Sequence, residues 1–155
     1  MKTIAKVLAV LGALFVCIIV LIAALLFLQS DFREEHEAFV REFMSDYSRQ
    51  WDTADVNDRL STAFLAQIGS PNAEQALSLF RRLGKVQGIT DVSVENFFAG
   101  TNGKSGVFVF KADFENAPAL VRLTLKESDG EIRVDGLHIT PSTEPPLLGS
   151  SHRDL

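Results

Sequence analysis

The chain has 155 residues, with 15 Lys and Arg against 20 Asp and Glu and a formal net charge of −5 at pH 7. Lys2 and Lys6 precede a long apolar segment, and the residues after that segment hold 13 basic and 20 acidic side chains. This acidic balance argues against nucleic acid as a partner, because nucleic-acid phosphates are bound by clustered cations. Cys17, the only cysteine, lies inside the apolar segment, so the remainder of the chain forms no disulfide of its own.

The apolar segment covers residues 7–28 and includes no charged residue, Asn, Gln or Pro. As a helix its 22 residues extend about 33 Å, enough to cross a hydrocarbon core of about 30 Å. The alternative is a cleaved signal peptide, but such peptides have a shorter apolar core and a small-x-small cleavage site. Here the segment ends in Leu-Phe-Leu and is followed by Gln-Ser. Lipoprotein processing is disfavoured because Phe15 and Val16 precede Cys17. We therefore predict a single-pass membrane anchor.

Residues 1–6 are predicted to be a cytoplasmic tail. Lys2 and Lys6 precede the anchor, while Arg33 and Arg41 follow it among acidic residues, so the positive charges on the two sides are nearly balanced. The short tail favours the usual arrangement of a signal anchor, with the N-terminus in the cytoplasm. The domain then faces the periplasm or the cell exterior.

Three helices are predicted after the anchor. The first, from Asp31 to Trp51, has apolar residues at spacings of three and four and continues from the anchor with little linker. The second, from Thr53 to Ile68, has a buried face of Val56, Leu60, Ala63, Phe64 and Ile68. Ser70 and Pro71 begin the third helix and Gly84 ends it. Its predicted buried stripe is Ala73, Ala76, Leu77, Phe80 and Leu83.

From residue 89 the periodicity changes to two, which predicts strands at 89–98, 106–114, 119–127 and 131–140. Asn102-Gly103 and Asp129-Gly130 are hairpin signals, so the strands are expected to form an antiparallel meander. The second strand begins apolar on both sides, which predicts cover on both faces. The apolar phase of the last strand slips at Gly136, which indicates a bulge. Residues 141–155, rich in Pro, Ser and Gly, are predicted to be a disordered tail.

Helices followed by a curved four-stranded antiparallel sheet predict an α+β domain over residues 31–140, with the long helix in the concave face. This order, together with the stretch KADFENAPALVRLTLKESDGEIRVDGLHI, resembles the cystatin-like, ketosteroid-isomerase-like (nuclear-transport-factor-2-like) superfamily and its small bacterial envelope domains. Many relatives carry a Trp in the last strand, where this chain has Ile132 and Arg133. The combination of anchor and fold also resembles the inner-membrane scaffold proteins of type IV secretion systems. The resemblance implies a bacterial inner (cytoplasmic) membrane location.

Enzymes of this superfamily place an Asp or His base and a Tyr donor inside the cone between sheet and helix. The resemblance therefore implies Tyr47, Asp113, Asp135 and His138 as candidate catalytic residues. The sequence around them favours plainer roles, because Asp113 and Asp135 adjoin basic residues on their strands and His138 is in phase with the outer face. The cone could also be filled by large side chains, which would exclude an enzyme: Phe39, Phe43, Phe64, Phe80, Phe108 and Phe110.

No metal site and no cofactor are predicted. His36-Glu37 begins the HExxH pattern of zinc proteases, but Val40 stands where the second His is required. His36 is interpreted as a polar position on an amphipathic helix. The glycines at 100, 103 and 106 are assigned to a hairpin turn and not to a phosphate-binding loop, which joins a strand to a helix.

We expect a membrane-anchored, non-enzymatic envelope domain that binds a partner protein or a small apolar ligand. Two alternatives stay open at this point: a ketosteroid-isomerase-like enzyme, and an accessory subunit of a membrane complex. A homo-oligomer is a further expectation, since Ala9, Gly12 and Ala13 form a small-residue patch that could support helix pairing within the membrane.

Overall fold

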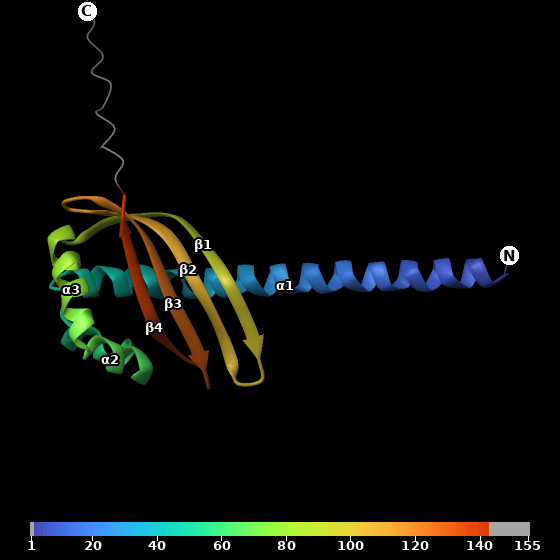
Figure 1. Cartoon of the computed structure of the whole chain (residues 1–155), viewed down its shortest axis with the longest axis horizontal. Helices are drawn as coiled ribbons and strands as arrows, with labels where there is room; N and C mark the ends of the chain where they lie inside the picture. Colours follow the sequence, from blue (N-terminus) through green and yellow to red (C-terminus); the bar gives the residue numbers. More distant parts are fainter. Residues whose placement is uncertain (1, 143–155) are drawn as a thin grey trace, which may run out of the picture.

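The computed structural model describes residues 2–142, and its architecture is α+β as predicted. Four helical segments precede a four-stranded antiparallel sheet (Figure 1). The predicted disordered tail at 141–155 lies outside the described residues except for Pro141 and Ser142. Pro141 ends the last strand, and the Ser142 backbone N–H donates to the Pro118 carbonyl at 2.9 Å.

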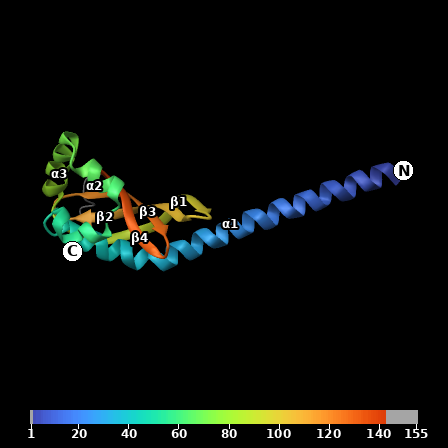
Figure 2. The same cartoon turned by 90° about the horizontal axis from the view of Figure 1, so that it is seen from below.

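Helix α1 runs without interruption from Lys2 to Ser48. It includes the predicted tail, the anchor and most of the first domain helix, because this stretch has no Pro and only one Gly, Gly12. Every large apolar side chain of residues 7–28 is exposed, and the helix is long and apolar enough to cross a membrane. Figures 1 and 2 show this half of α1 projecting away from the domain.

The C-terminus of α1 lies three residues before the predicted end at Trp51. Trp51 has a positive φ of 53°, which turns the chain out of the helix, and its backbone N–H donates to the Tyr47 carbonyl at 2.8 Å. The indole of Trp51 is buried and donates through Nε1 to the Gly84 carbonyl at 3.1 Å. This contact joins the end of α1 to the end of α3 (Pro71–Leu83).

The second predicted helix is divided in the structure into a 3₁₀ helix η1 (Thr53–Arg59) and α2 (Thr62–Ile68). Leu60 and Ser61 between them are extended, because Leu60 pairs with Val134 of the sheet and the Ser61 N–H donates to the Val134 carbonyl at 2.9 Å. Helix α3 has the predicted bounds, with Pro71 in its first turn and Gly84 at φ 79° after it. Ser70 makes no side-chain cap and donates instead to the Gln67 carbonyl at 2.7 Å.

The strands form the predicted meander in the order β1-β2-β3-β4, every pair antiparallel. Their bounds are β1 Val86–Gly100, β2 Gly103–Phe114, β3 Pro118–Ser128 and β4 Glu131–Pro141. Asp129 and Gly130 both have positive φ, as their turn requires. The predicted bulge in β4 is confirmed: Thr124 pairs with Gly136 and Leu125 with Val134, which leaves Asp135 as the extra residue.

The core lies between α1 and one face of the sheet (Figure 2). Phe108 and Phe110 of β2 and Phe43 of α1 are fully or almost fully buried there, so large side chains fill this space, as the sequence allowed. The prediction that β2 is covered on both faces holds only in part, because Val109 on the outer face is buried whereas Val107 is partly exposed. The outer face of β2 carries the exposed Lys111, and in register the exposed Arg122 of β3 lies beside Val109.

Candidate functional site

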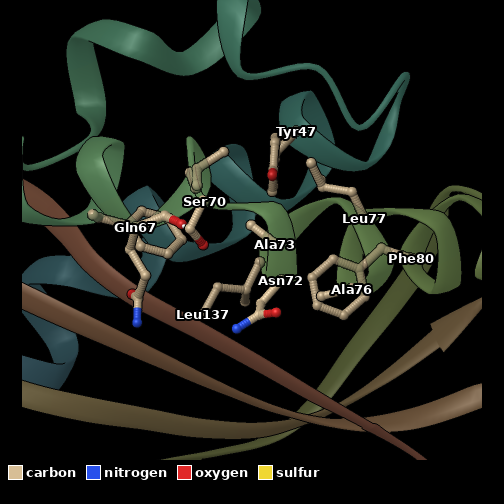
Figure 3. A pocket seen from close by; sticks show the side chains of 11 residues that line it. Tyr47, Gln67, Ser70, Asn72, Ala73, Ala76, Leu77, Phe80 and Leu137 are labelled. Carbon is tan, nitrogen blue, oxygen red and sulfur yellow. The ribbon is translucent and has the colours of Figure 1, made fainter.

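A pocket of about 330 Å³ opens beside the core, where the last turn of α1, the α2–α3 hairpin and β4 meet (Figure 3). Its volume is at the lower end of the range for small-molecule sites. Side chains of four elements line it, and none of them is charged: Tyr47, Phe64, Gln67, Ile68, Ser70, Asn72, Ala73, Ala76, Leu77, Phe80 and Leu137. We call this the α2–α3 pocket.

The pocket exists because α2 and α3 form a short hairpin with small residues on its inner side. Gly69 ends α2, and Ser70-Pro71 begins α3 two residues later. Ala73 and Ala76 of α3 line the space next to Tyr47, where larger side chains would occupy it (Figure 3). The predicted stripe of α3 faces inward as expected, but most of it is only partly buried. Only Leu83 is buried, and the four other members line the pocket while remaining partly exposed.

Tyr47 provides the main polar group of the pocket. It is 2% exposed and packs between the rings of Phe43 and Trp51, at centroid distances of 5.6 and 5.3 Å. Burial raises the pKa of Tyr47 to about 12, while the Arg81 charge lowers it and the Asp52 charge raises it. The hydroxyl is therefore neutral at physiological pH.

The Tyr47 hydroxyl makes no hydrogen bond to any other described residue. The hydroxyl is open to the pocket and is therefore able to donate to a bound molecule. Phe64, Phe80 and Leu137 supply apolar walls, whereas Gln67 and Asn72 are exposed and supply amide groups. The site thus combines apolar walls with one hydroxyl donor that is open to the pocket.

The structure does not bring Tyr47 together with the other candidate catalytic residues. Asp113 is exposed on β2 opposite Gly88, and His138 is exposed on β4. Asp135, the bulge residue, accepts a hydrogen bond from the Ser61 hydroxyl at 2.6 Å. None of the three lines the α2–α3 pocket. The acid–base arrangement implied by the resemblance is therefore not formed around Tyr47.

Asp135 has a structural role that its position explains. Ser61 is the N-cap of α2, and its Oγ accepts from the Phe64 backbone N–H at 3.0 Å. The same hydroxyl donates to Asp135, so the β4 bulge fixes the cap, and the cap fixes the start of α2. Asp135 thus positions one wall of the pocket from outside it.

His36 occupies a buried site and not the simple polar position predicted for it. It is 7% exposed, lies edge-on to Phe32 at a centroid distance of 4.5 Å, and its Nε2 is 3.0 Å from Glu127 Oε2 of β3. Glu35, His36 and Glu127 each offer a ligand atom within 4.8 Å of the others, a set that could hold a divalent cation. The ammonium of Lys104, 3.9 Å from Glu35, already supplies positive charge there.

The chain matches no protein-family model, no curated protein and no solved structure.

Proposed function

We propose that this chain is a membrane-anchored, non-enzymatic domain that binds a small, neutral, mainly apolar molecule in the α2–α3 pocket. The observation that carries the proposal is the Tyr47 hydroxyl, which is neutral and makes no hydrogen bond to residues 2–142. It belongs to a side chain that is only 2% exposed, and that side chain lines the pocket. A bound molecule with a carbonyl, ether or hydroxyl oxygen would accept its hydrogen bond.

The chemistry of the walls defines the ligand class. No lining residue is charged, so a charged molecule would lose hydration without gaining an ionic partner. Apolar walls from α2, α3 and β4 favour a compact hydrocarbon or ring system. The exposed amides of Gln67 and Asn72 can bind a second polar group near solvent.

The anchor belongs to the same proposal. Residues 7–28 expose their apolar side chains, and α1 continues from them directly into the core, where Phe32 is fully buried. Cleavage after residue 28 would cut within this helix, which supports an uncleaved anchor over a signal peptide. The short lysine-containing segment before the anchor supports a cytoplasmic N-terminus, hence a domain on the periplasmic or outer side of a bacterial inner membrane. The order of helices and strands supports a cystatin-like relationship.

A partner protein is the competing occupant of the pocket, because an apolar side chain of a partner could enter it. Native mass spectrometry of the full chain, extracted gently from its own membrane, separates the cases. A lone chain that carries a small neutral molecule supports the proposal. A stable complex with another protein, or a homo-oligomer, without any small molecule favours the accessory-subunit alternative.

The binding step itself can be tested with benzophenone, an apolar probe that has one carbonyl acceptor and forms photochemical crosslinks. The full chain in phosphatidylcholine nanodiscs should be crosslinked at α2 and α3. Tyr47→Phe removes one hydrogen bond of about 1 kcal/mol and should weaken binding about fivefold. Ala73→Phe should abolish binding by filling the pocket.

The matched control is Ala66→Phe, which adds the same ring to the exposed side of α2 outside the pocket lining. It should bind benzophenone as the parent chain does. Equal crosslinking of the Ala73→Phe and Ala66→Phe variants would show that the probe binds elsewhere, and the proposed site would be rejected.

A further inference from the structure

Strand β1 lies at the membrane end of the sheet. The side chain of Gln29, the first residue after the anchor segment, donates a hydrogen bond to the Val94 carbonyl. Leu26 of the anchor and Val94 line the same cleft of about 250 Å³, together with Arg33. In Figures 1 and 2 the turn between β1 and β2 is the part of the sheet that reaches furthest along the long axis of the molecule, toward the N-terminal end of α1.

The height of this turn above the bilayer follows from the helix geometry. The ring of Phe97 on β1 lies 5.3 Å from the ring of Phe32 on α1. Phe32 is four residues past Leu28, or about 6 Å along the helix. The headgroup layer extends about 5–7 Å beyond the hydrocarbon core on each side. The end of β1 therefore lies at the level of the lipid headgroups.

The residues at the end of β1 are suited to the lipid headgroup layer. We call residues 96–103 (NFFAGTNG) the hairpin tip; it contains no charged side chain, so its entry into the headgroup layer desolvates no charge. Phe98 is 67% exposed. Beyond the anchor, the other exposed large hydrophobic residue in the described chain is Leu79, on α3 at the far end of the domain. Segments that lie in the membrane interface bury Trp, Phe and Leu side chains at the boundary between headgroups and acyl chains, so an exposed Phe is more stable there than in water.

We propose that the hairpin tip inserts into the headgroup layer of the bilayer that α1 crosses, with Phe98 as the side chain that holds it there. This inference rests on the membrane anchor of the proposed function and is independent of the pocket. The partner is the neutral lipid interface, since the acidic domain lacks the clustered cations that anionic lipids require. Two contacts, α1 and the hairpin tip, then fix the rotation of the domain about the membrane normal.

The test uses the full chain in phosphatidylcholine vesicles that contain lipid with a nitroxide on its headgroup. A fluorophore is placed on Thr101→Cys, in the turn of the hairpin tip, in a Cys17→Ser background. The control carries it on Leu79→Cys in the same background. The Thr101 label should be quenched strongly and the Leu79 label weakly. Adding Phe98→Ser should reduce quenching of the Thr101 label to the level of the Leu79 label.

A further label on the native Cys17, quenched by lipid that carries its nitroxide deep in the acyl chain, reports on the anchor alone. If the Cys17 label is quenched and the Thr101 label behaves like the Leu79 label, the hairpin tip does not reach the lipid and the inference is overturned, while the anchor stands. If Phe98→Ser leaves the Thr101 signal unchanged, Phe98 does not hold the tip and the inference is likewise overturned. An unquenched Cys17 label would overturn the anchor and the inference together.

Discussion

Raising the pH above 10 should destabilise the folded domain through Tyr47. Burial raises its pKa from 10.0 to about 12 in the folded chain, whereas the hydroxyl of the unfolded chain ionises near 10. Below pH 10 the hydroxyl is neutral in both states, and its contribution to stability is complete. Between pH 10 and 12 only the unfolded state releases the proton. The free energy of unfolding should therefore fall by about 1.4 kcal/mol per pH unit, or about 2–3 kcal/mol in total.

The assay is urea unfolding of the full chain in detergent micelles, followed by the fluorescence of Trp51, the only tryptophan. The control is Tyr47→Phe, which keeps the ring and removes the ionisation, so that subtraction cancels the effect of Lys and Arg residues. Between pH 9 and pH 12 the free energy of unfolding should fall by about 2–3 kcal/mol more in the parent chain than in Tyr47→Phe. Tyr47 is also the only tyrosine, so tyrosinate absorbance measures its ionisation directly. A midpoint near 10 in the folded chain, with equal losses in both variants, would refute the claim that the folded domain raises the pKa of Tyr47.

Two further predictions concern packing and capping. In Gly106→Ala the new Cβ would lie 3.0 Å from both the Phe32 ring and Val94. The free energy of unfolding of this variant, measured in urea, should therefore be about 1–3 kcal/mol lower than that of the parent chain. In the control Gly88→Ala the nearest atom to the new Cβ would be 3.8 Å away, so the free energy of unfolding should change by less than about 1 kcal/mol. Similar losses in the Gly106→Ala and Gly88→Ala variants would contradict the close contact of α1 with β2. Ser61→Ala removes the cap of α2 and should lose about 1–2 kcal/mol, and a double-mutant cycle with Asp135→Ala should give a coupling of about 1 kcal/mol. Additive losses would show that Asp135 does not support the cap.

The features that the sequence predicted correctly are those set by neighbouring residues. Asp129 and Gly130 tolerate positive φ, so their turn needs no help from the rest of the fold. Pro71 and Gly84 bound α3 by their own backbone preferences. The slip of the apolar phase at Gly136 marked the β4 bulge within one residue, because a bulge changes which face a strand residue occupies.

The features that were missed depend on residues far apart in the chain. Helix patterning predicted a single helix through Leu60 and Ser61, but a backbone contact with Val134 straightens the chain there. The partner of His36 is Glu127, 91 residues away, and only the register of β3 brings it near. Periodicity identified the inner side of α3 correctly, yet it does not say whether a neighbouring element covers that side. The α2–α3 pocket arises from this missing cover.

If residues 7–28 cross a bilayer and the pocket binds a ligand as proposed, the unbroken course of α1 also governs how that ligand reaches the pocket. Tyr47 is 19 residues beyond Leu28 on the same helix, which places its Cα about 28 Å above the hydrocarbon edge when the helix is upright and about 21 Å above it at a tilt of 40°. A molecule dissolved in the lipid cannot diffuse sideways into a cavity at that height. It has to pass through water or be handed over by a soluble carrier. The occupancy of the pocket is then set by competition with the bilayer as a solvent, so the membrane acts as a reservoir that keeps the free ligand scarce.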